Sequence, residues 1–378
     1  MIFGERLWSR LRKACLTVAV LIPVANVALA ETQALRQSEP QASPSDVGPL
    51  PLAVLGDSDS HGYQDTLRMP SGTHWRGGPF RAQTFQWTEV LTALRADQIH
   101  LGQRAVWGVH PRWARLRHLV GLSARTPAKL DHSHNFAQAG AECRDLIDGQ
   151  IGQAPALAAL MDEQPDVWRR GIVVIRIGIN SLGQRDVLER LARDHRDGLV
   201  QAVIRDCLAR IRQAVAVIRG HQPGTRFVLV GVLNNVDWPK YFEYWHRASD
   251  IANIERGLAA FDAELRQWSE ADPRVAFFDD RSWFSRRWGN RGADGEVAYK
   301  SLRLGNGFQV VHGTGDDPGH SVLTDGHAGA VWNAMWAQSL VALINQRWGL
   351  AVRPISEGEI ISLLRIAPSR AEAPRDQR

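Results

Sequence analysis

The chain has 378 residues, of which 44% are hydrophobic and 22% are charged, with a formal net charge of +5. This balance is that of an ordinary globular protein and excludes a wholly disordered chain. Almost all of the basic residues are arginines scattered among acids, a pattern typical of solvated helix faces that argues against a nucleic-acid partner.

Residues 1–30 have the composition of a secretory signal peptide. A basic start precedes the apolar stretch 15–30, which ends in the small residues of Ala28-Leu29-Ala30. The stretch is short for a membrane-spanning helix and contains Pro23, which favours a cleaved signal over the alternative of a retained anchor. We therefore predict a periplasmic or secreted protein with no stable membrane insertion after cleavage. Residues 31–48 are polar and are predicted to form a flexible lead-in.

Short, almost continuous apolar runs predict strands of a parallel sheet that is covered on both faces. Such runs occur at residues 50–55, 172–177, 227–233 and 275–278, with a shorter candidate at 133–137. Apolar residues at helical spacing occupy residues 86–95, 139–147, 154–161, 199–218, 251–269 and 330–346. The alternation predicts one α/β domain over residues 49–350, a three-layer α/β/α sandwich with a mostly parallel central sheet. Residues 351–378 are predicted to be a partly disordered tail.

Three stretches do not fit a minimal sandwich and are interpreted as loop insertions: 66–82, 98–131 and 281–320, the last with a possible hairpin around Gly305 and Gly307. Their tryptophans could form a sugar-stacking platform and their arginines could attract an anionic substrate; they include Trp75, Trp107, Trp113, Arg76, Arg81, Arg104 and Arg112. An oxidising compartment permits a bridge between Cys143 and Cys207, but their places on predicted helices favour two separate buried thiols.

Three polar motifs follow predicted strands. Gly56-Asp57-Ser58 ends the first strand, Gly140 follows the short candidate strand, and Asn180 comes directly after residues 172–177. Open α/β sheets bind ligands at the carboxyl ends of their strands, so a hydroxyl and several N–H donors are expected to meet at one edge. A fourth motif, Asp325-Gly326-His327, precedes the last helix and offers a carboxylate that can hold an imidazole facing a serine.

The order of these four motifs resembles the block pattern of the SGNH (GDSL-like) hydrolase superfamily, over about residues 50–346. The resemblance implies a flavodoxin-like fold with Ser58 as the nucleophile, His327 as the general base and Asp325 as the carboxylate that orients it. It also implies an oxyanion hole made of the Ser58 amide, the Gly140 amide and the Asn180 side chain, with no metal and no cofactor.

Three departures from the family pattern stand out. Asp325 and His327 are separated by one residue, whereas the family separates them by two; Asp317 and His320 have the usual spacing and are a rival pair. His327 is preferred because a long helix is predicted directly after it. Ser181 replaces the aspartate that commonly follows the asparagine, which could loosen Asn180. Asp59 replaces the usual leucine after the serine, which could oppose an alkoxide nearby.

Together these features predict a carboxylic ester hydrolase that works through a covalent acyl-enzyme on a small-molecule or glycan ester. An O-acyl group on an envelope or extracellular glycan is the preferred substrate. Two alternatives remain: a glycan O-acetyltransferase, and a non-catalytic glycan-binding or assembly protein on the same fold. The histidines near the motifs have no metal-ligand spacing; they are His61, His74, His132 and His134. The acyl group, the alcohol and the oligomeric state are not specified by the sequence.

Overall fold

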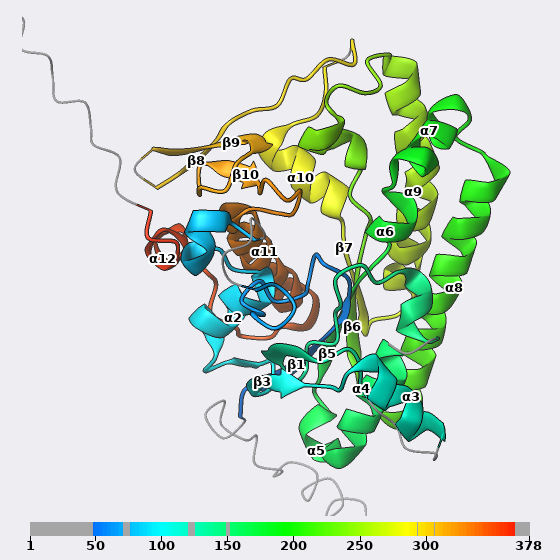
Figure 1. Cartoon of the computed structure of the whole chain (residues 1–378), viewed down its shortest axis with the longest axis vertical. Coiled ribbons are helices and arrows are strands. Elements are labelled where there is room, and N and C mark those ends of the chain that lie inside the picture. Colours follow the sequence, from blue (N-terminus) through cyan, green and yellow to red (C-terminus); the bar gives the residue numbers. More distant parts are fainter. Residues whose placement is uncertain are drawn as a thin grey trace, which may run out of the picture. The chain divides into compact units, whose positions relative to one another are not determined.

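Five parallel strands form the central sheet, in the order β2-β1-β5-β6-β7 (Figure 1). The strands are β1 (Leu50–Gly56), β2 (Ile99–His100), β5 (Ile172–Arg176), β6 (Arg226–Val230) and β7 (Val275–Phe278). Every residue of β1 and β5 is buried, which explains why these strands appear in the sequence as unbroken apolar runs. Taken in chain order, the strands lie as second, first, third, fourth and fifth, so the chain reverses direction across the sheet between β1 and β5. Ligand sites lie at such a reversal in flavodoxin-like sheets.

The structure is a computed structural model that describes residues 48–70, 76–119, 125–148, 152–292, 294–305 and 307–366. The predicted signal peptide, nearly all of the predicted lead-in, and the tail beyond Ile366 lie outside these residues. The described residues from Pro49 to Ile366 belong to one compact unit. No helix in the described ranges combines the length and the apolar character needed to cross a membrane.

Helices cover both faces of the sheet. One face carries α2 (Trp87–Arg95) and α11 (Ala330–Trp348), and the other carries α4 (Gln153–Glu163), α8 (Gly198–His221) and α9 (Ala248–Ala271) (Figure 1). The helix α11 is apolar nearly all round because it packs into the interior, with Trp332 and Trp336 almost completely buried. The predicted three-layer α/β/α sandwich with a mostly parallel sheet is therefore confirmed.

Smaller elements complete the domain. The short helices are α3 (Pro111–Leu119), α5 (Pro165–Trp168), α6 (Ile179–Leu182), α7 (Arg185–Arg193), α10 (Asp280–Trp288) and α12 (Glu357–Leu363), with single 3-10 turns η1 (Gly78–Gln83), η2 (Cys143–Leu146), η3 (Asn235–Asp237) and η4 (Pro239–Tyr241). Outside the central sheet, β3 (Arg104–Trp107) pairs with β4 (Lys129–His132), and β8 (Leu302–Leu304), β9 (Phe308–Thr314) and β10 (His320–Val322) form a small sheet. The strands β8 and β9 are antiparallel, as the predicted hairpin requires.

Three local predictions were wrong. Residues 133–137 form only one bridge to β1, between Asn135 and Val54, and not a full strand. Residues 139–147 contain only η2 instead of a helix, since Gly140 takes a left-handed φ of +81° that a helix does not permit. The start of the 281–320 stretch is the helix α10, whose aromatic and basic residues obscure the helical spacing of its apolar face.

The first part of the predicted tail is ordered and belongs to the domain. Ile355 and Ile360 are buried against the core, and α12 begins with a capping box formed by Ser356 and Glu359. Glu359 also pairs with the buried Arg95 of α2 at 2.8 Å. These contacts tie residues 351–366 to the face of the sheet that carries α2 and α11.

Cys143 and Cys207 form a disulfide bond, whereas the sequence favoured two separate thiols. Their Cα atoms lie 5.0 Å apart, within the range that disulfides span. The predicted helix 139–147 had hidden this pairing, because the actual short turn η2 brings Cys143 against α8.

The disulfide is expected to stabilise the folded protein by about 2–4 kcal/mol, since it links residues that are 64 positions apart and restricts the unfolded chain. Reducing it should therefore lower the midpoint of thermal unfolding, measured by calorimetry with and without reductant. A variant with serine at both positions should already melt low and should not respond to reductant. An unchanged midpoint after verified release of both thiols would contradict this expectation.

Candidate active site

Ser58 lies directly beyond the carboxyl end of β1. Gly56 ends the strand, and its N–H donates to Gln153 Oε1 at 2.7 Å. A Cβ at Gly56 would collide with the backbone oxygen of Arg176, so glycine is needed where β1 and β5 approach. Gln86, at the start of α2, donates from Nε2 to the Ser58 carbonyl oxygen at 3.2 Å. The chain around Ser58 is therefore held from both faces of the sheet, at Gly56 by Gln153 and at Ser58 by Gln86.

Asp325 and His327 lie in the turn between β10 and α11. Gly326 separates them and has a φ of +83°, the left-handed conformation that glycine adopts at little cost. Oδ1 of Asp325 accepts a hydrogen bond from the His327 backbone N–H at 3.0 Å and lies 3.1 Å from Nδ1 of the ring. The ring contact is close but is not aligned as a hydrogen bond. The tight turn thus lets an Asp-Gly-His sequence bring the carboxylate against the imidazole.

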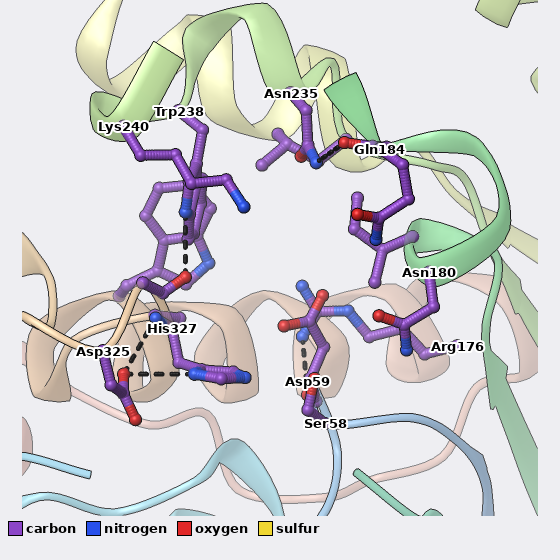
Figure 2. A pocket seen from close by; sticks show the side chains of 16 residues that line it. Ser58, Asp59, Arg176, Asn180, Gln184, Asn235, Trp238, Lys240, Asp325 and His327 are labelled. Atoms are coloured by element: carbon purple, nitrogen blue, oxygen red, sulfur yellow. Dashed lines mark hydrogen bonds and ion pairs between the residues drawn. The ribbon is translucent and has the colours of Figure 1, made fainter. Parts of the chain in front are cut away.

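Ser58, Asn180, Asp325 and His327 line one cavity of about 210 Å³. Figure 2 shows the His327 ring directed from its turn toward Ser58, with Asn180 on the other side of the cavity. In the described part of the chain, the hydrogen bonds of Ser58 and His327 run to other residues and not to each other. Contacts between a nucleophile and its base are often longer in an empty site than in the substrate complex. The structure thus brings Ser58, Asn180, Asp325 and His327 to one cavity, with no hydrogen bond between the Ser58 hydroxyl and the His327 ring.

Gly140 and Asn180 reach the same edge of the sheet by different routes. The Gln138 N–H donates to the end of β1 at 3.0 Å, which holds the segment before Gly140 beside the strand. Asn180 is in α6, directly after β5, and its Nδ2 donates to the Ala141 oxygen at 2.9 Å. This bond fixes the Asn180 side chain without help from an acidic neighbour. Gly140 is exposed and is not among the described residues that line the cavity.

The rival pair lies elsewhere. Asp317 Oδ2 and His320 Nδ1 are 2.8 Å apart, so these residues do form an acid–histidine contact. Neither of them is among the described residues that line the cavity of Ser58. The structure therefore brings His327, and not His320, into the cavity.

Arg176 offsets the charge of Asp59, a role that the sequence analysis missed. Both residues line the cavity, and Arg176 Nη1 donates to the Asp59 backbone oxygen at 3.0 Å, while Nη2 pairs with Asp280 at 3.1 Å. Burial alone would lower the pKa of Arg176, but the surrounding acids outweigh it and raise the pKa, so the guanidinium stays charged. A lone arginine at the end of an apolar strand was the available signal.

Arg76 holds Asp325 from the side away from His327. Its backbone N–H and its Nη1 donate to Asp325 Oδ2 at 3.1 and 3.2 Å, and its guanidinium lies over the ring of Tyr63 at 4.7 Å. Arg76 is only 1% exposed, so it does not face a substrate as the sequence analysis considered. Burial would raise the pKa of Asp325, but His327 and Arg76 outweigh this effect and lower it to about 2.

His61 supports the segment that carries Gly140. Its Nδ1 accepts a hydrogen bond from the Ala139 N–H at 3.1 Å, and its Nε2 lies 2.8 Å from Asp65 Oδ2. Burial, together with the nearby Lys129, lowers the pKa of His61 to about 4, so the ring is neutral near pH 7 and Nδ1 is free to accept. This link could not be predicted from the sequence, because His61 and Ala139 are 78 residues apart.

Replacing Asp325 with asparagine is expected to lower the free energy of unfolding by about 2 kcal/mol near neutral pH, from the drop in its pKa from 3.8 to about 2. A depressed carboxyl pKa stabilises the fold above the unfolded-state value, and this stabilisation is lost as the pH falls through the folded-state value. The gap between wild type and variant should therefore close between about pH 4 and pH 2 in denaturant titrations. Asp317→Asn, at the partly exposed rival pair, should cost less than about 1 kcal/mol. If the difference in unfolding free energy between wild type and Asp325→Asn stays constant down to pH 2, then the Asp325 carboxylate is not stabilised by His327 and Arg76 as described.

Among the described residues, no group of three or more His, Cys, Asp or Glu side chains is arranged to hold a metal ion. The tryptophans that line the cavity are Trp238 and Trp332, from a loop and from α11. They differ from the insertion tryptophans that the sequence analysis considered: Trp107 and Trp113 do not line the cavity, and Trp75 lies outside the described residues.

Comparisons with known proteins add little to this site. No protein-family model matches the chain, and no curated protein matches it in sequence. Among solved structures, the lipase Lip_vut3 from a goat rumen metagenome is 13% identical, with 78% of this chain and 97% of that chain covered and a TM-score of 0.39. An extracellular lipase from Streptomyces rimosus is 16% identical, with coverages of 62% and 82% and a TM-score of 0.30. Such distant likenesses carry no argument for activity, which must rest on the residues of the site.

Proposed function

We propose that the protein is a serine-dependent ester hydrolase of the SGNH (GDSL-like) kind, which removes a short acyl group from a glycan. One observation carries the proposal: Ser58, His327 and Asn180 line a single cavity at the edge of the sheet where the strand order reverses between β1 and β5. These residues come from three distant parts of the chain. Because they line one cavity, a single ester carbonyl bound there could contact all three.

The first half of the reaction acylates the serine. The Ser58 hydroxyl attacks the ester carbonyl carbon while His327 accepts its proton, and Asp325 stabilises the imidazolium that results. The Asn180 side chain and the Ser58 amide donate hydrogen bonds to the oxyanion of the tetrahedral intermediate, whereas Gly140 does not line the cavity and is left out of this step. Loss of one such donor typically raises the barrier by about 3 kcal/mol. The carbon–oxygen bond to the alcohol then breaks, and His327 gives its proton to the leaving alcohol.

The second half releases the acid. A water molecule loses a proton to His327 and attacks the acyl-serine carbonyl. The second tetrahedral intermediate that forms has its oxyanion stabilised by the same hydrogen-bond donors. Its collapse breaks the bond to Ser58, and His327 returns the proton to the serine oxygen. The balance is one water consumed, with one carboxylic acid and one alcohol formed, and no cofactor takes part.

The size and walls of the cavity favour a short acyl group on a polar alcohol. About 210 Å³ is less than the volume of most drug-sized ligand pockets. The walls include Trp238 and Trp332, which are both buried, the amides of Gln184 and Asn235, and charged side chains such as Lys240. A lining this polar suits an alcohol with several hydroxyl groups, such as a sugar.

The direct test is acetate release from p-nitrophenyl acetate and from an acetylated polysaccharide by the purified protein. We expect release from both, with acetate appearing in water and not on an added sugar acceptor. Transfer to the acceptor in place of release would favour an O-acetyltransferase. Binding of the glycan without release or transfer would favour a non-catalytic binding protein, and the hydrolase proposal would then be wrong.

A further inference from the structure

A second cavity, of about 540 Å³, adjoins the cavity of Ser58. Asn180 and Gln184 form part of the wall of both cavities, so the two are neighbours across these side chains. Asn180 is also a proposed oxyanion donor. A molecule whose ester carbonyl lies at Ser58 therefore needs to extend only past Asn180 to enter the second cavity.

The walls of the second cavity are held in place from two sides. One side is α7 and α8, which contribute Asp186, Val187, Val203 and Asp206. The other side is η2 with its flanking residues, and the disulfide between Cys143 and Cys207 ties η2 to α8 at the cavity wall. A covalent tie at this place preserves the shape of the cavity, which lowers the entropic cost of binding an extended ligand.

The chemistry of the second cavity suits a neutral polar chain. Its charged residues are the acids Glu142, Asp186 and Asp206 and the single base Arg144, which lies 3.4 Å from Glu142. The wall also contains the apolar side chains of Val187, Ala202 and Val203, but a long acyl chain along it would still take water from the charged groups, which is unfavourable. A chain of acidic sugars would meet an excess of negative charge. Hydroxyl groups can donate to the carboxylates and accept from the amides, so neutral sugars match the wall.

We infer that the substrate is a neutral oligosaccharide or polysaccharide that carries its acyl group within the chain, with sugar units beyond the acylated one bound in the second cavity. This inference rests on the proposed function and adds the substrate class: the preferred substrate is a chain of neutral sugars, hydrolysed more efficiently than a small ester or a lipid. The added sugars contribute binding energy away from the reacting carbonyl, which raises kcat/KM for long substrates.

The test fills the second cavity from α8. Val203 lines it and is 38% exposed, so Val203→Trp adds bulk to the cavity without opening the core. Leu199, on the same helix and 65% exposed, does not line the cavity, and Leu199→Trp is the matched control. Asp206→Trp is a second blocking variant at a side chain that is 62% exposed, in case Val203→Trp fails to fold.

Values of kcat/KM are compared for p-nitrophenyl acetate, an acetylated monosaccharide and the matching acetylated neutral hexasaccharide. In the wild type and in Leu199→Trp, we expect kcat/KM to rise by about 10-fold or more from the monosaccharide to the hexasaccharide, a gain of about 1.4 kcal/mol. In Val203→Trp and Asp206→Trp this gain should vanish while p-nitrophenyl acetate hydrolysis stays unchanged. An acetylated hexauronate should gain less than the neutral chain.

Other outcomes decide against the inference. Equal kcat/KM for the monosaccharide and the hexasaccharide in the wild type would overturn it, and so would a gain that survives both blocking variants. The wild type could instead show a higher kcat/KM for long p-nitrophenyl acyl esters than for p-nitrophenyl acetate. If Val203→Trp abolishes that increase, the second cavity binds the acyl chain and not a glycan. If no ester is hydrolysed, the proposed function fails separately from this inference. Calorimetric binding of the deacetylated hexasaccharide to the wild type, but not to Val203→Trp, would still support the second cavity as a glycan site. No binding to the wild type would reject the second cavity as a glycan site.

Discussion

Replacing His327 with alanine is expected to lower kcat for p-nitrophenyl acetate by about 10³-fold, because the Ser58 hydroxyl then loses the base that accepts its proton. The imidazole lines the same cavity as Ser58, and Asp325 lies 3.1 Å from its far nitrogen. KM should change little, because the ring acts on the proton and not on the bound ester. Initial rates near neutral pH give both constants.

His320→Ala is the matched control for this prediction. His320 also contacts a carboxylate, that of Asp317 at 2.8 Å, but it is not among the described residues of the cavity. We expect His320→Ala to keep kcat within a few-fold of the wild type. The reverse pattern, with activity lost in His320→Ala and kept in His327→Ala, would show that the rival pair supplies the base.

Replacing Asn180 with alanine is expected to lower kcat by about 10²- to 10³-fold with a small change in KM, the signature of a donor that acts mainly in the transition state. Asn180 lines the cavity with Ser58, and its Nδ2 is held by the Ala141 oxygen at 2.9 Å. The same substitution also removes the hydrogen bond to the Ala141 oxygen, so the segment next to the cavity is expected to loosen as well.

Gln184→Ala provides the comparison for Asn180. Gln184 lines the same cavity and is exposed, and the described residues give its side chain no hydrogen bond. Its loss is expected to alter KM modestly and to leave kcat near the wild-type value. If Asn180→Ala instead raises KM and preserves kcat, then Asn180 binds the ground state and the oxyanion must be held by other groups.

The sheet was predictable from the sequence because its strands are buried on both faces. The runs at 50–55, 172–177 and 275–278 contain almost only large apolar residues, and each became a strand of the central sheet. The edge strand β2 was missed, because it has only two residues and no apolar run that would predict a strand. The prediction of a helix over 139–147 was wrong for a different reason. The spacing of apolar residues carries no information on the backbone angles, and Gly140 has a positive φ.

The residues of the candidate site could be named from the sequence because each follows a strand or precedes a helix in a fixed order. What could not be predicted were the partners that hold them, which come from distant parts of the chain. Arg76 and Asp325 are 249 residues apart, and His61 and Ala139 are 78 apart. The contact of Arg76 depends on how its insertion folds back over the sheet edge, and that of His61 on how two strand-end segments meet; neither residue type nor spacing specifies these paths.

The most direct measurement of the central claim is mass spectrometry of the folded protein after treatment with a fluorophosphonate, which reacts with activated serine hydroxyls. We predict one adduct on the peptide that contains Ser58, formed rapidly in the wild type, slowly in His327→Ala, and absent from Ser58→Ala and from unfolded protein. A folded wild type that gains no adduct, or an adduct that persists in Ser58→Ala, would contradict the assignment of Ser58 as the nucleophile.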